Sequence, residues 1–509
     1  MTRAIAASYP PSQIREIPDA LIDRQIEQKF HWLSVIWILA LYAIGVFFWG
    51  NFLNWGKTPL DFEDWGVINS PRFDFMQDAL RSGQLPLHMK YENFHDQDHP
   101  LHGVTDRFLS MPDVITTPQT LLLAGVGIST FIYFDLLIHF TIATLGLLWF
   151  RRKYNLSLLA YGILFLLFHF NGYIQSHYGI GHITWAGYFL FPWFIALMIQ
   201  FVEGEQNWIW VARVACLLFY MVLAGSEHHF TWVLIFLGVF ALVCYDKIKW
   251  ILAAGLCAGL LSAVRLLPPL LIVQAIQSTS VHKLLVGYPT LLDLGRSMVT
   301  LVPSANLNFV ASGVDWLGYW EFDIYVGLTG AAFIIFFGIF SWLRQVRLFP
   351  TFQKLIAPLL VVFLLSVGKY YSSTRVLRIP LFDGERAPSR MIGLPLTILI
   401  LIAVIYFQNW LDEKRISQQL ALGVSVVMLI LLGNDLWTHS RSWKLEAIRA
   451  AFGPAKITLS GSSVTNHFDK LYFILIILGM LCSMLTGVFL FLHVRQEQSR
   501  REKRMVITV

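Results

Sequence analysis

The sequence predicts an all-α, polytopic integral membrane protein with about twelve transmembrane helices and a long first loop that carries interfacial helices. Hydrophobic residues make up 56% of the 509 residues and charged residues only 14%, whereas a soluble domain carries about 25% charged residues. The apolar residues gather in runs of about 20, the length that a spanning helix needs. Both observations exclude a soluble globular chain.

Apolar runs suited to spans occur along most of the sequence. They lie near residues 31–50, 119–150, 156–172, 182–202, 208–224, 229–245, 250–272, 324–343, 355–368, 391–410, 417–434 and 471–494. The first run is too long for a signal-peptide core, so we expect it to remain as a helix. The predicted division is therefore a cytoplasmic N-terminal segment at 1–30, a transmembrane domain at 31–494 and a basic cytoplasmic tail at 495–509.

Basic residues predict the orientation of the spans. With the N-terminus inside, the short inner loops receive the Lys and Arg clusters near 151–153, 247–249, 344–347, 414–415 and 495–504. The elaborated loops then share the outer face, and the longest of them is 51–118. Such asymmetry is typical of an enzyme or receptor with one working face. Because the basic residues lie between apolar runs, we expect no nucleic-acid partner.

The loop at 51–118 opens with three carboxylates in four residues, Asp61, Glu63 and Asp64, directly after the first apolar run. A carboxylate at the membrane surface can take a proton from an incoming hydroxyl group that lies within hydrogen-bonding reach. The alternative interpretation is a set of ordinary acidic loop residues. Further along, residues 71–80 predict a short amphipathic helix at the interface.

A dense group of His and acidic residues follows that helix. His95 and His99 lie four residues apart and are the candidate metal ligands, with Zn²⁺, Mg²⁺ and Mn²⁺ as the cations considered. Solvated polar loop residues are the alternative.

Three more outer positions carry candidate binding residues. His182 lies at the mouth of one span, and Glu227 with His228 begins another, where ionisable groups are costly unless they face a polar partner or cavity. Arg386 and Arg390 precede the span at 391–410, and arginine is suited to bidentate recognition of phosphate. A structural hydrogen-bond network, or an anionic-lipid rim for the arginines, is the alternative.

These features together resemble the polytopic GT-C glycosyltransferases, and most closely their YfhO-like bacterial branch. The resemblance is carried by the acidic first loop with its interfacial helix, Gly-x-Leu-Pro-Leu at 83–87, Gly-x-x-His ending at 182, Gly-Ser-Glu-His-His at 225–229, Trp-Glu-Phe-Asp-Ile-Tyr-Val-Gly at 320–327 and Arg-Ala-Pro-Ser-Arg at 386–390. Each motif is short, so the match is at the level of the superfamily. The large soluble C-terminal domain of many relatives has no counterpart in the short segment 435–470.

The resemblance implies inverting transfer of a sugar from a polyprenyl-phosphate donor to a lipid, glycan or protein acceptor on the outer face of a bacterial inner (plasma) membrane. The implied general base is Asp64, with Asp61 and Glu63 as rivals. Glu321 would be a second acid that places the acceptor or a divalent cation, Mg²⁺ or Mn²⁺. Arg386 and Arg390 would stabilise the departing phosphate.

Two other classes of function remain open on the sequence. The fold could serve as a non-catalytic subunit or scaffold of a larger membrane complex, with partner subunits and membrane lipids as its contacts. A secondary transporter is the other, although its ionisable groups are expected near the bilayer midplane, and most of those found here lie at the ends of spans.

Overall fold

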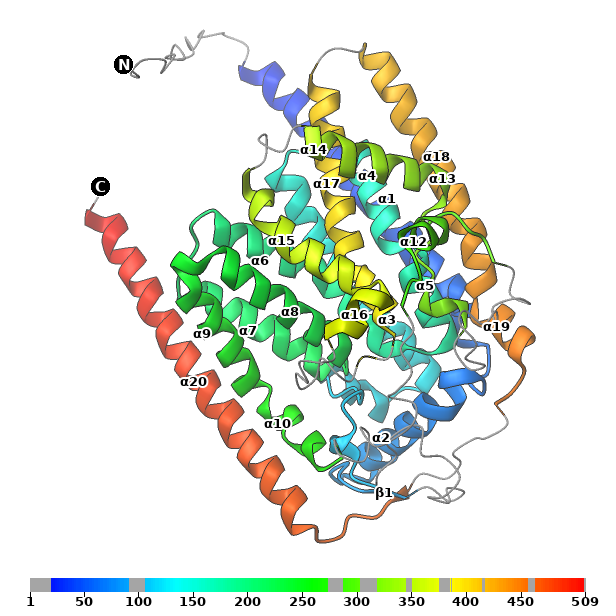
Figure 1. The fold of residues 1–509 in the computed structure, drawn as a ribbon, viewed down its shortest axis with the longest axis vertical. Coiled ribbons are helices and arrows are strands. Elements are labelled where there is room, and N and C mark those ends of the chain that lie inside the picture. The colour runs from blue at the N-terminus through cyan, green and yellow to red at the C-terminus, as the bar shows by residue number, and fades with distance from the viewer. Residues whose placement is uncertain are drawn as a thin grey trace. The chain divides into compact units, whose positions relative to one another are not determined.

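The computed structural model describes residues 20–90, 106–272, 287–302, 318–344, 350–374, 385, 387–413, 417–455 and 463–507, which are almost entirely helical (Figure 1). The chain divides into two units, residues 1–44 and 45–509. Helix α1 (Ala20–Phe52) begins in the first unit and ends in the second. The second unit holds all the other helices and strands of the described residues.

The helices and strands follow one another with short connections in the described parts of the chain. The first helices after α1 are α2 (Ser70–Ser82), α3 (Ile128–Lys153), α4 (Leu158–His169), α5 (Gly172–Ile180), α6 (Phe191–Val202), α7 (Trp208–Leu223), α8 (Glu227–Val243), α9 (Ile248–Leu261) and α10 (Ala263–Leu266). The later ones are α12 (Leu291–Ser297), α13 (Gly327–Phe333), α14 (Trp342–Arg344), α15 (Pro350–Leu365), α16 (Gly368–Thr374), α17 (Gly393–Asp412), α18 (Gln418–Trp443), α19 (Leu445–Phe452) and α20 (Lys470–Ile507).

Short 3₁₀ and π segments join or extend these helices. They are η1 (Asn54–Gly56), η2 (Trp65–Asn69), η4 (Phe108–Ser110), η5 (Pro118–Ala124), η6 (Ile183–Leu190), η7 (Tyr245–Lys247), η8 (Pro268–Leu271), η11 (Tyr319–Glu321), η12 (Ile334–Ser341) and η14 (Pro388–Ile392). Two short strands, β1 (Met89–Lys90) and β2 (Ser463–Val464), pair antiparallel, with Met89 opposite Val464.

Side-chain caps explain where several helices begin. The side chains of Ser157, Asn171, Asn207 and Ser417 each accept a hydrogen bond from a backbone N–H in the first turn of α4, α5, α7 and α18. Gly83 ends α2 in a left-handed conformation with φ +69°, which suits glycine. The predicted amphipathic helix at 71–80 is thus confirmed as α2, with Phe73 and Met76 buried.

The described residues contain eight helices long and apolar enough to cross a membrane, or up to ten if each of two bent pairs is one span. This confirms a multi-pass α-helical membrane protein but not the predicted count of about twelve. The runs at 229–245 and 250–272 give α8 and α9, which bend by 103° at their junction, and α15 and α16 bend by 98°. Helix α7 has only 16 residues. Hydropathy alone does not reveal bends or helix lengths, so the sequence could not predict which apolar runs form a bent pair.

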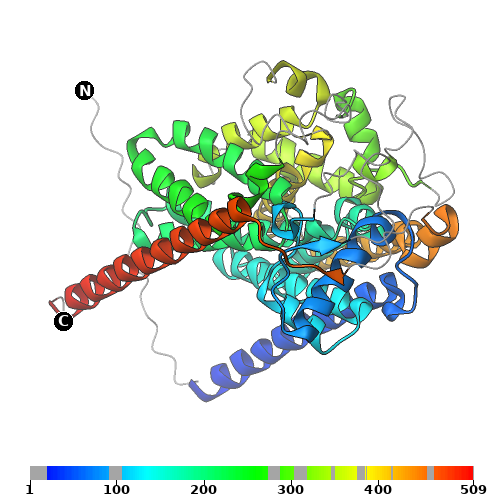
Figure 2. The same cartoon turned by 90° about the horizontal axis from the view of Figure 1, so that it is seen from below.

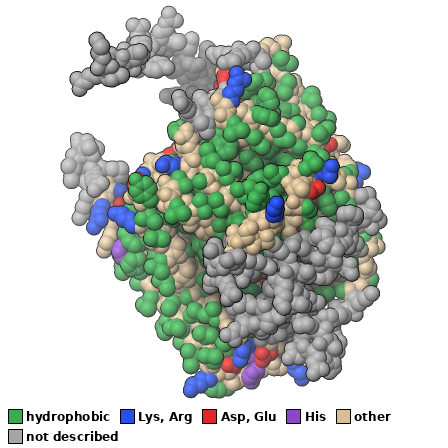
Figure 3. Space-filling model, viewed as in Figure 1, with side chains coloured by type: hydrophobic (Ala, Val, Ile, Leu, Met, Phe, Trp, Pro, Cys, Tyr) green, Lys and Arg blue, Asp and Glu red, His purple; other side chains and the backbone are tan. Residues whose placement is uncertain are grey.

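Hydrophobic side chains cover much of the described surface (Figure 3). Large apolar residues are exposed along α18 and α20, among them Leu422, Val427, Ile430, Ile477, Met484 and Leu485. A soluble monomer seldom exposes contiguous apolar surface on this scale, whereas a lipid-facing helix requires it. In contrast, α17 is enclosed by α4, α15 and η12, and nearly all of its side chains are buried.

The segment at 51–118 is anchored to two helices that are distant in sequence. Helix α20 packs along α7, α9 and α10 (Figure 1), and β2, just before it, pairs with β1 of the segment (Figure 2). Buried Arg265 of α10 donates hydrogen bonds to the backbone carbonyls of Leu109, Met111 and Val114 at 2.8 to 3.1 Å. Arg265 therefore satisfies three backbone carbonyls of the segment and, among the described residues, forms no ion pair with an acid.

Replacing Arg265 by Ala is expected to lower the free energy of unfolding by about 3 kcal/mol, because two buried carbonyls and one partly buried carbonyl lose their donor. SDS titration of the purified protein in mixed micelles measures this change. Arg213→Ala is the matched control, since Arg213 is 54% exposed and its ion pair with Glu205 is 3.6 Å long. Equal effects of the two substitutions would show that Arg265 does not anchor the segment.

Candidate functional site

The carboxylate of Asp64 contacts a histidine from another part of the chain. Its Oδ2 lies 3.1 Å from Nε2 of His182, and its side chain is 34% exposed. Asp64 is the residue that precedes the π-helix η2, and His182 precedes η6. Two residues predicted separately from the sequence therefore meet at the ends of two helices.

A close backbone approach fixes this contact. Gly181 has φ +107°, and a Cβ atom there would lie 2.5 Å from the backbone N of Trp65. The side-chain amide of Asn69 donates to the carbonyl of Gly181 at 2.6 Å and to that of Asp64 at 2.9 Å. Glycine at 181 thus allows the two loops to touch, and Asn69 joins them.

Stacked rings lead from His182 into the protein. His182 Nδ1 lies 2.7 Å from Nδ1 of buried His177, and the ring of His177 stacks on Trp185 with centroids 4.1 Å apart. A neutral imidazole carries one N–H, so a His182 that donates to Asp64 from Nε2 accepts from His177 at Nδ1. The tautomer of His177 is thereby coupled to the contact between His182 and Asp64.

Arg390 and Glu321 form a buried ion pair that contacts the same tryptophan. Arg390 of η14 donates from Nε and Nη2 to the two carboxylate oxygens of Glu321 in η11, each at 2.5 Å. The side chains are 3% and 1% exposed. The guanidinium also lies 5.0 Å from the ring of Trp185, a cation–π distance. Trp185 thus connects the Asp64–His182 contact to the Arg390–Glu321 pair.

A second acidic branch reaches Arg390 through His228. Nε2 of His228 lies 3.5 Å from both Nη1 of Arg390 and Oε1 of Glu227, while its Nδ1 lies 2.9 Å from Oε2 of Glu385. Burial raises the pKa of Glu385, but the charge and hydrogen bond of His228, with help from Arg390, lower it to about 2. Glu385 is therefore an anion at physiological pH.

Six of the sequence-predicted site residues belong to this one network, although they come from separate helix ends along the chain: Asp64, His182, Glu227, His228, Glu321 and Arg390. The other predicted residues fall into two groups. Asp61 and Glu63 are described but make other contacts, which are given below. Arg386, His95 and His99 lie outside the described residues.

Asp61 forms an ion pair with Arg449 of α19. Nε and Nη2 of Arg449 donate to the two carboxylate oxygens at 2.7 and 2.9 Å. The hydrogen bond from Arg449 holds the pKa of Asp61 below its usual value. A carboxylate engaged on both oxygens is a poor proton acceptor, so this geometry favours Asp64 over Asp61 as a base.

Glu63 lies between these two acids in a strained conformation. Its φ is +41°, which a non-glycine residue seldom adopts. Burial and the neighbouring charge of Asp64 raise the pKa of Glu63 to about 7. Adjacent carboxyl groups in different environments are typical of acid and base pairs at active sites, although structural pairs also behave this way.

Trp185 and Glu385 were not predicted as site residues from the sequence. Each lies close in sequence to a residue that was, so proximity to His182 or to Arg386 is the only sequence signal. Their roles depend on packing between distant segments.

A second polar cluster lies deep in the fold. Oδ2 of Asp323 lies 2.8 Å from Nε2 of His439 and accepts from Trp443 Nε1 at 2.7 Å, and His439 Nδ1 lies 3.2 Å from the amide oxygen of Gln175. Tyr325 stacks on His439 at 4.4 Å. All these partners are buried and satisfied, which indicates a structural role that joins α5 and α18.

Comparison of the sequence with protein-family models gives no match, and comparison with functionally curated proteins gives none either. The function is therefore inferred from the residues of the site and their geometry.

Gly181→Ala is expected to destabilise the protein more than Gly204→Ala, by about 1 to 3 kcal/mol, because the added methyl group overlaps the backbone of Trp65 and Asp64. Gly204 is the matched control, with φ +113° and open space around its Cβ position. Both substitutions incur the same left-handed strain, so their difference isolates the contact. Thermal unfolding in detergent gives the comparison, and equal midpoints would argue against a close approach at Gly181.

Glu63→Gln is expected to change how stability depends on pH. Because the pKa of Glu63 is raised to about 7, the folded state binds the proton more tightly than the unfolded state, and wild-type stability falls as pH rises from about 4.5 to 7. The Gln variant lacks this loss of stability. The difference between its unfolding midpoint and that of wild type therefore shifts in favour of the variant from about pH 4.5 to 7 and is constant at higher pH. Parallel curves for the two proteins would contradict the prediction.

Asp61→Asn supplies a control of opposite sign. Its carboxyl pKa is lowered by Arg449, so the stability it contributes is present above pH 3.8 and is lost as pH falls below that value. The variant is therefore expected to be less stable than wild type near neutrality and to approach it in acid.

Proposed function

We propose that this chain is a membrane glycosyltransferase that moves a sugar from a polyprenyl-phosphate donor to an acceptor hydroxyl, with Asp64 as the general base. The single observation that carries the proposal is the partly exposed Asp64 carboxylate, held by His182 at one end of a network that contains Arg390 at the other. The motifs behind the GT-C resemblance supply these residues.

Direct displacement needs a base and a stabilised leaving group. In the proposed step the acceptor oxygen forms a bond to the anomeric carbon while the bond from that carbon to the phosphate oxygen breaks. The electron pair leaves with polyprenyl phosphate, and the acceptor proton passes to Asp64. His182 keeps the carboxylate oriented.

Phosphate recognition is assigned to Arg390 and His228. Two guanidinium nitrogens of Arg390 are engaged with Glu321, whereas Nη1 faces His228, whose side chain is 26% exposed. We therefore assign the leaving phosphate to this edge. Glu321 acts as a positioning residue for Arg390, in contrast to the acceptor or cation site that the resemblance implies.

The proposed location is a bacterial inner membrane, with both termini cytoplasmic and the segment at 51–118 outside. Basic residues support this orientation, since Arg151, Arg152 and Lys153 end α3, and Arg495, Arg500 and Arg501 lie in the last turns of α20. Asp64 then meets the lipid-linked donor at the opposite surface.

A secondary transporter is the second candidate, favoured by one observation. Asp135 and His139 in α3 are fully buried, and Nδ1 of His139 lies 3.4 Å from Oδ2 of Asp135. Ionisable groups inside a span are typical of ion pathways. The pair is also connected through Gln119 to Tyr220, which is consistent with a structural network.

The test is a donor half-reaction that requires no knowledge of the acceptor. Purified protein in proteoliposomes receives polyprenyl-phosphate sugars, and the released polyprenyl phosphate is measured. Asp64→Asn is expected to reduce release by about 100-fold or more, since a general base contributes about 10² to 10⁴.

Asp61→Asn is the matched control and is expected to retain most of the activity, because its carboxylate is committed to Arg449. Loss of activity in Glu63→Gln with retention in Asp64→Asn would move the base to Glu63. No release from any tested sugar donor by the wild-type protein, together with proton-coupled uptake that requires Asp135, would replace the proposal with the transporter.

A further inference from the structure

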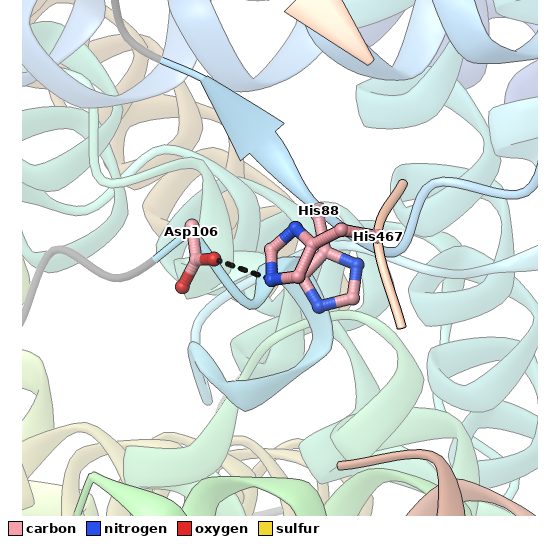
Figure 4. Close-up of side chains that lie close together, drawn as sticks. All are labelled: His88, Asp106 and His467. Atoms are coloured by element: carbon pink, nitrogen blue, oxygen red, sulfur yellow. Dashed lines mark ion pairs between the residues drawn. The ribbon is translucent and has the colours of Figure 1, made fainter. Parts of the chain in front are cut away.

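Three side chains suited to binding a metal meet where the segment at 51–118 joins the chain ahead of α20. They are His88, directly before β1, Asp106, and His467, three residues after β2 (Figure 4). One ligand atom from each lies within 4.8 Å of the other two. The cluster does not involve the network around Asp64, so a metal here is independent of the proposed function.

His88 is buried without a polar partner for its ring. Its exposure is 0%, and neither ring nitrogen has a hydrogen-bond partner within the described part of the chain. A buried polar group left unsatisfied costs about 1 to 3 kcal/mol.

The surrounding backbone holds the cluster together. The N–H of His88 donates to the side-chain oxygen of Asn466 at 3.1 Å, and the N–H of Thr465 donates to the carbonyl of His88 at 3.1 Å. The rings of His88 and His467 lie 4.0 Å apart, and Tyr472 packs edge-on against His88 at 5.2 Å. The two histidines are therefore brought together by the fold and not by chance contact of surface side chains.

The other two ligands have room to adjust. Asp106 and His467 are 51% and 54% exposed, and Oδ2 of the first lies 3.6 Å from Nε2 of the second. Ligand atoms around a tetrahedral zinc ion lie about 3.4 Å apart, given bonds of about 2.0 to 2.1 Å. Movement of the exposed side chains by about 1 Å toward buried His88 reaches that geometry.

We propose that His88, Asp106 and His467 bind Zn²⁺, with water in the fourth position, and that the ion clips the segment at 51–118 to the residues ahead of α20. Two imidazoles and one carboxylate suit zinc, whereas Mg²⁺ and Ca²⁺ prefer all-oxygen sites. His95 and His99, the candidate metal ligands from the sequence, lie outside the described residues.

Zinc analysis of the full chain tests the proposal. Tag-free protein in nanodiscs is stripped with a chelator, dialysed against limiting Zn²⁺ and analysed by elemental mass spectrometry. Wild type is expected to retain about one zinc ion per chain. His88→Ala, His467→Ala and Asp106→Asn are expected to bind zinc about 100-fold more weakly, since even the loss of a residue that only hydrogen-bonds to a ligand weakens metal binding by about 10- to 100-fold. Asp78→Asn and His493→Ala, which change the same residue types outside the cluster, are expected to match wild type.

X-ray absorption at the zinc edge gives a second measurement that needs no variant. The loaded wild-type protein is expected to show two imidazole ligands and oxygen neighbours at about 2.0 Å. The proposal would be overturned if His88→Ala bound zinc as tightly as wild type, or if binding were lost only in the double variant His95→Ala, His99→Ala. A spectrum without two imidazole ligands would also overturn it. A rise in the unfolding midpoint of wild type with Zn²⁺, absent in His88→Ala, would support the clip.

Discussion

The buried ion pair between Arg390 and Glu321 is the constraint on which the rest of the site depends. Two charges that are 3% and 1% exposed must pair, and removing one partner of such a pair costs about 3 to 5 kcal/mol. The pair joins the turn before α17 to the turn before α13. Trp185 packs on the guanidinium and stacks on His177, so the position of His182, and through it that of Asp64, follows from the same contact.

Much of the fold class and part of the site could be predicted from the sequence. Composition requires a membrane bundle, and polar motifs at helix ends converge because neighbouring helices end at similar depths. The partners could not be predicted, since Arg390 and Glu321 are 69 residues apart and meet only through packing. The bend between α8 and α9 could not be predicted for a related reason, because it leaves no mark in hydropathy.

The three carboxylates at 61–64 show the limit of motif-based reasoning most clearly. They are equivalent in sequence, yet Asp61 pairs with Arg449, Asp64 contacts His182, and Glu63 is held half-buried between them. The positive φ of Glu63 turns the chain sharply enough to send its two neighbours to different partners. The sequence pattern shows that this region is acidic, but only the tertiary contacts distinguish its three carboxyl groups. Asp61 is in an ion pair, Glu63 has a pKa of about 7, and Asp64 is the candidate base.

A long polar segment can hold a catalytic group in place only if other contacts reduce the conformational entropy of its backbone. Arg265 binds three of its carbonyls, β1 pairs with β2, and Asn69 ties Asp64 to the loop at Gly181. These contacts act at separate points along the segment, so none replaces another. The ring of His88 differs from these contacts, because the fold buries it and leaves both of its nitrogens without a protein partner in the described part of the chain. A metal ion at that point would satisfy the ring and add a further restraint on the segment that carries Asp64.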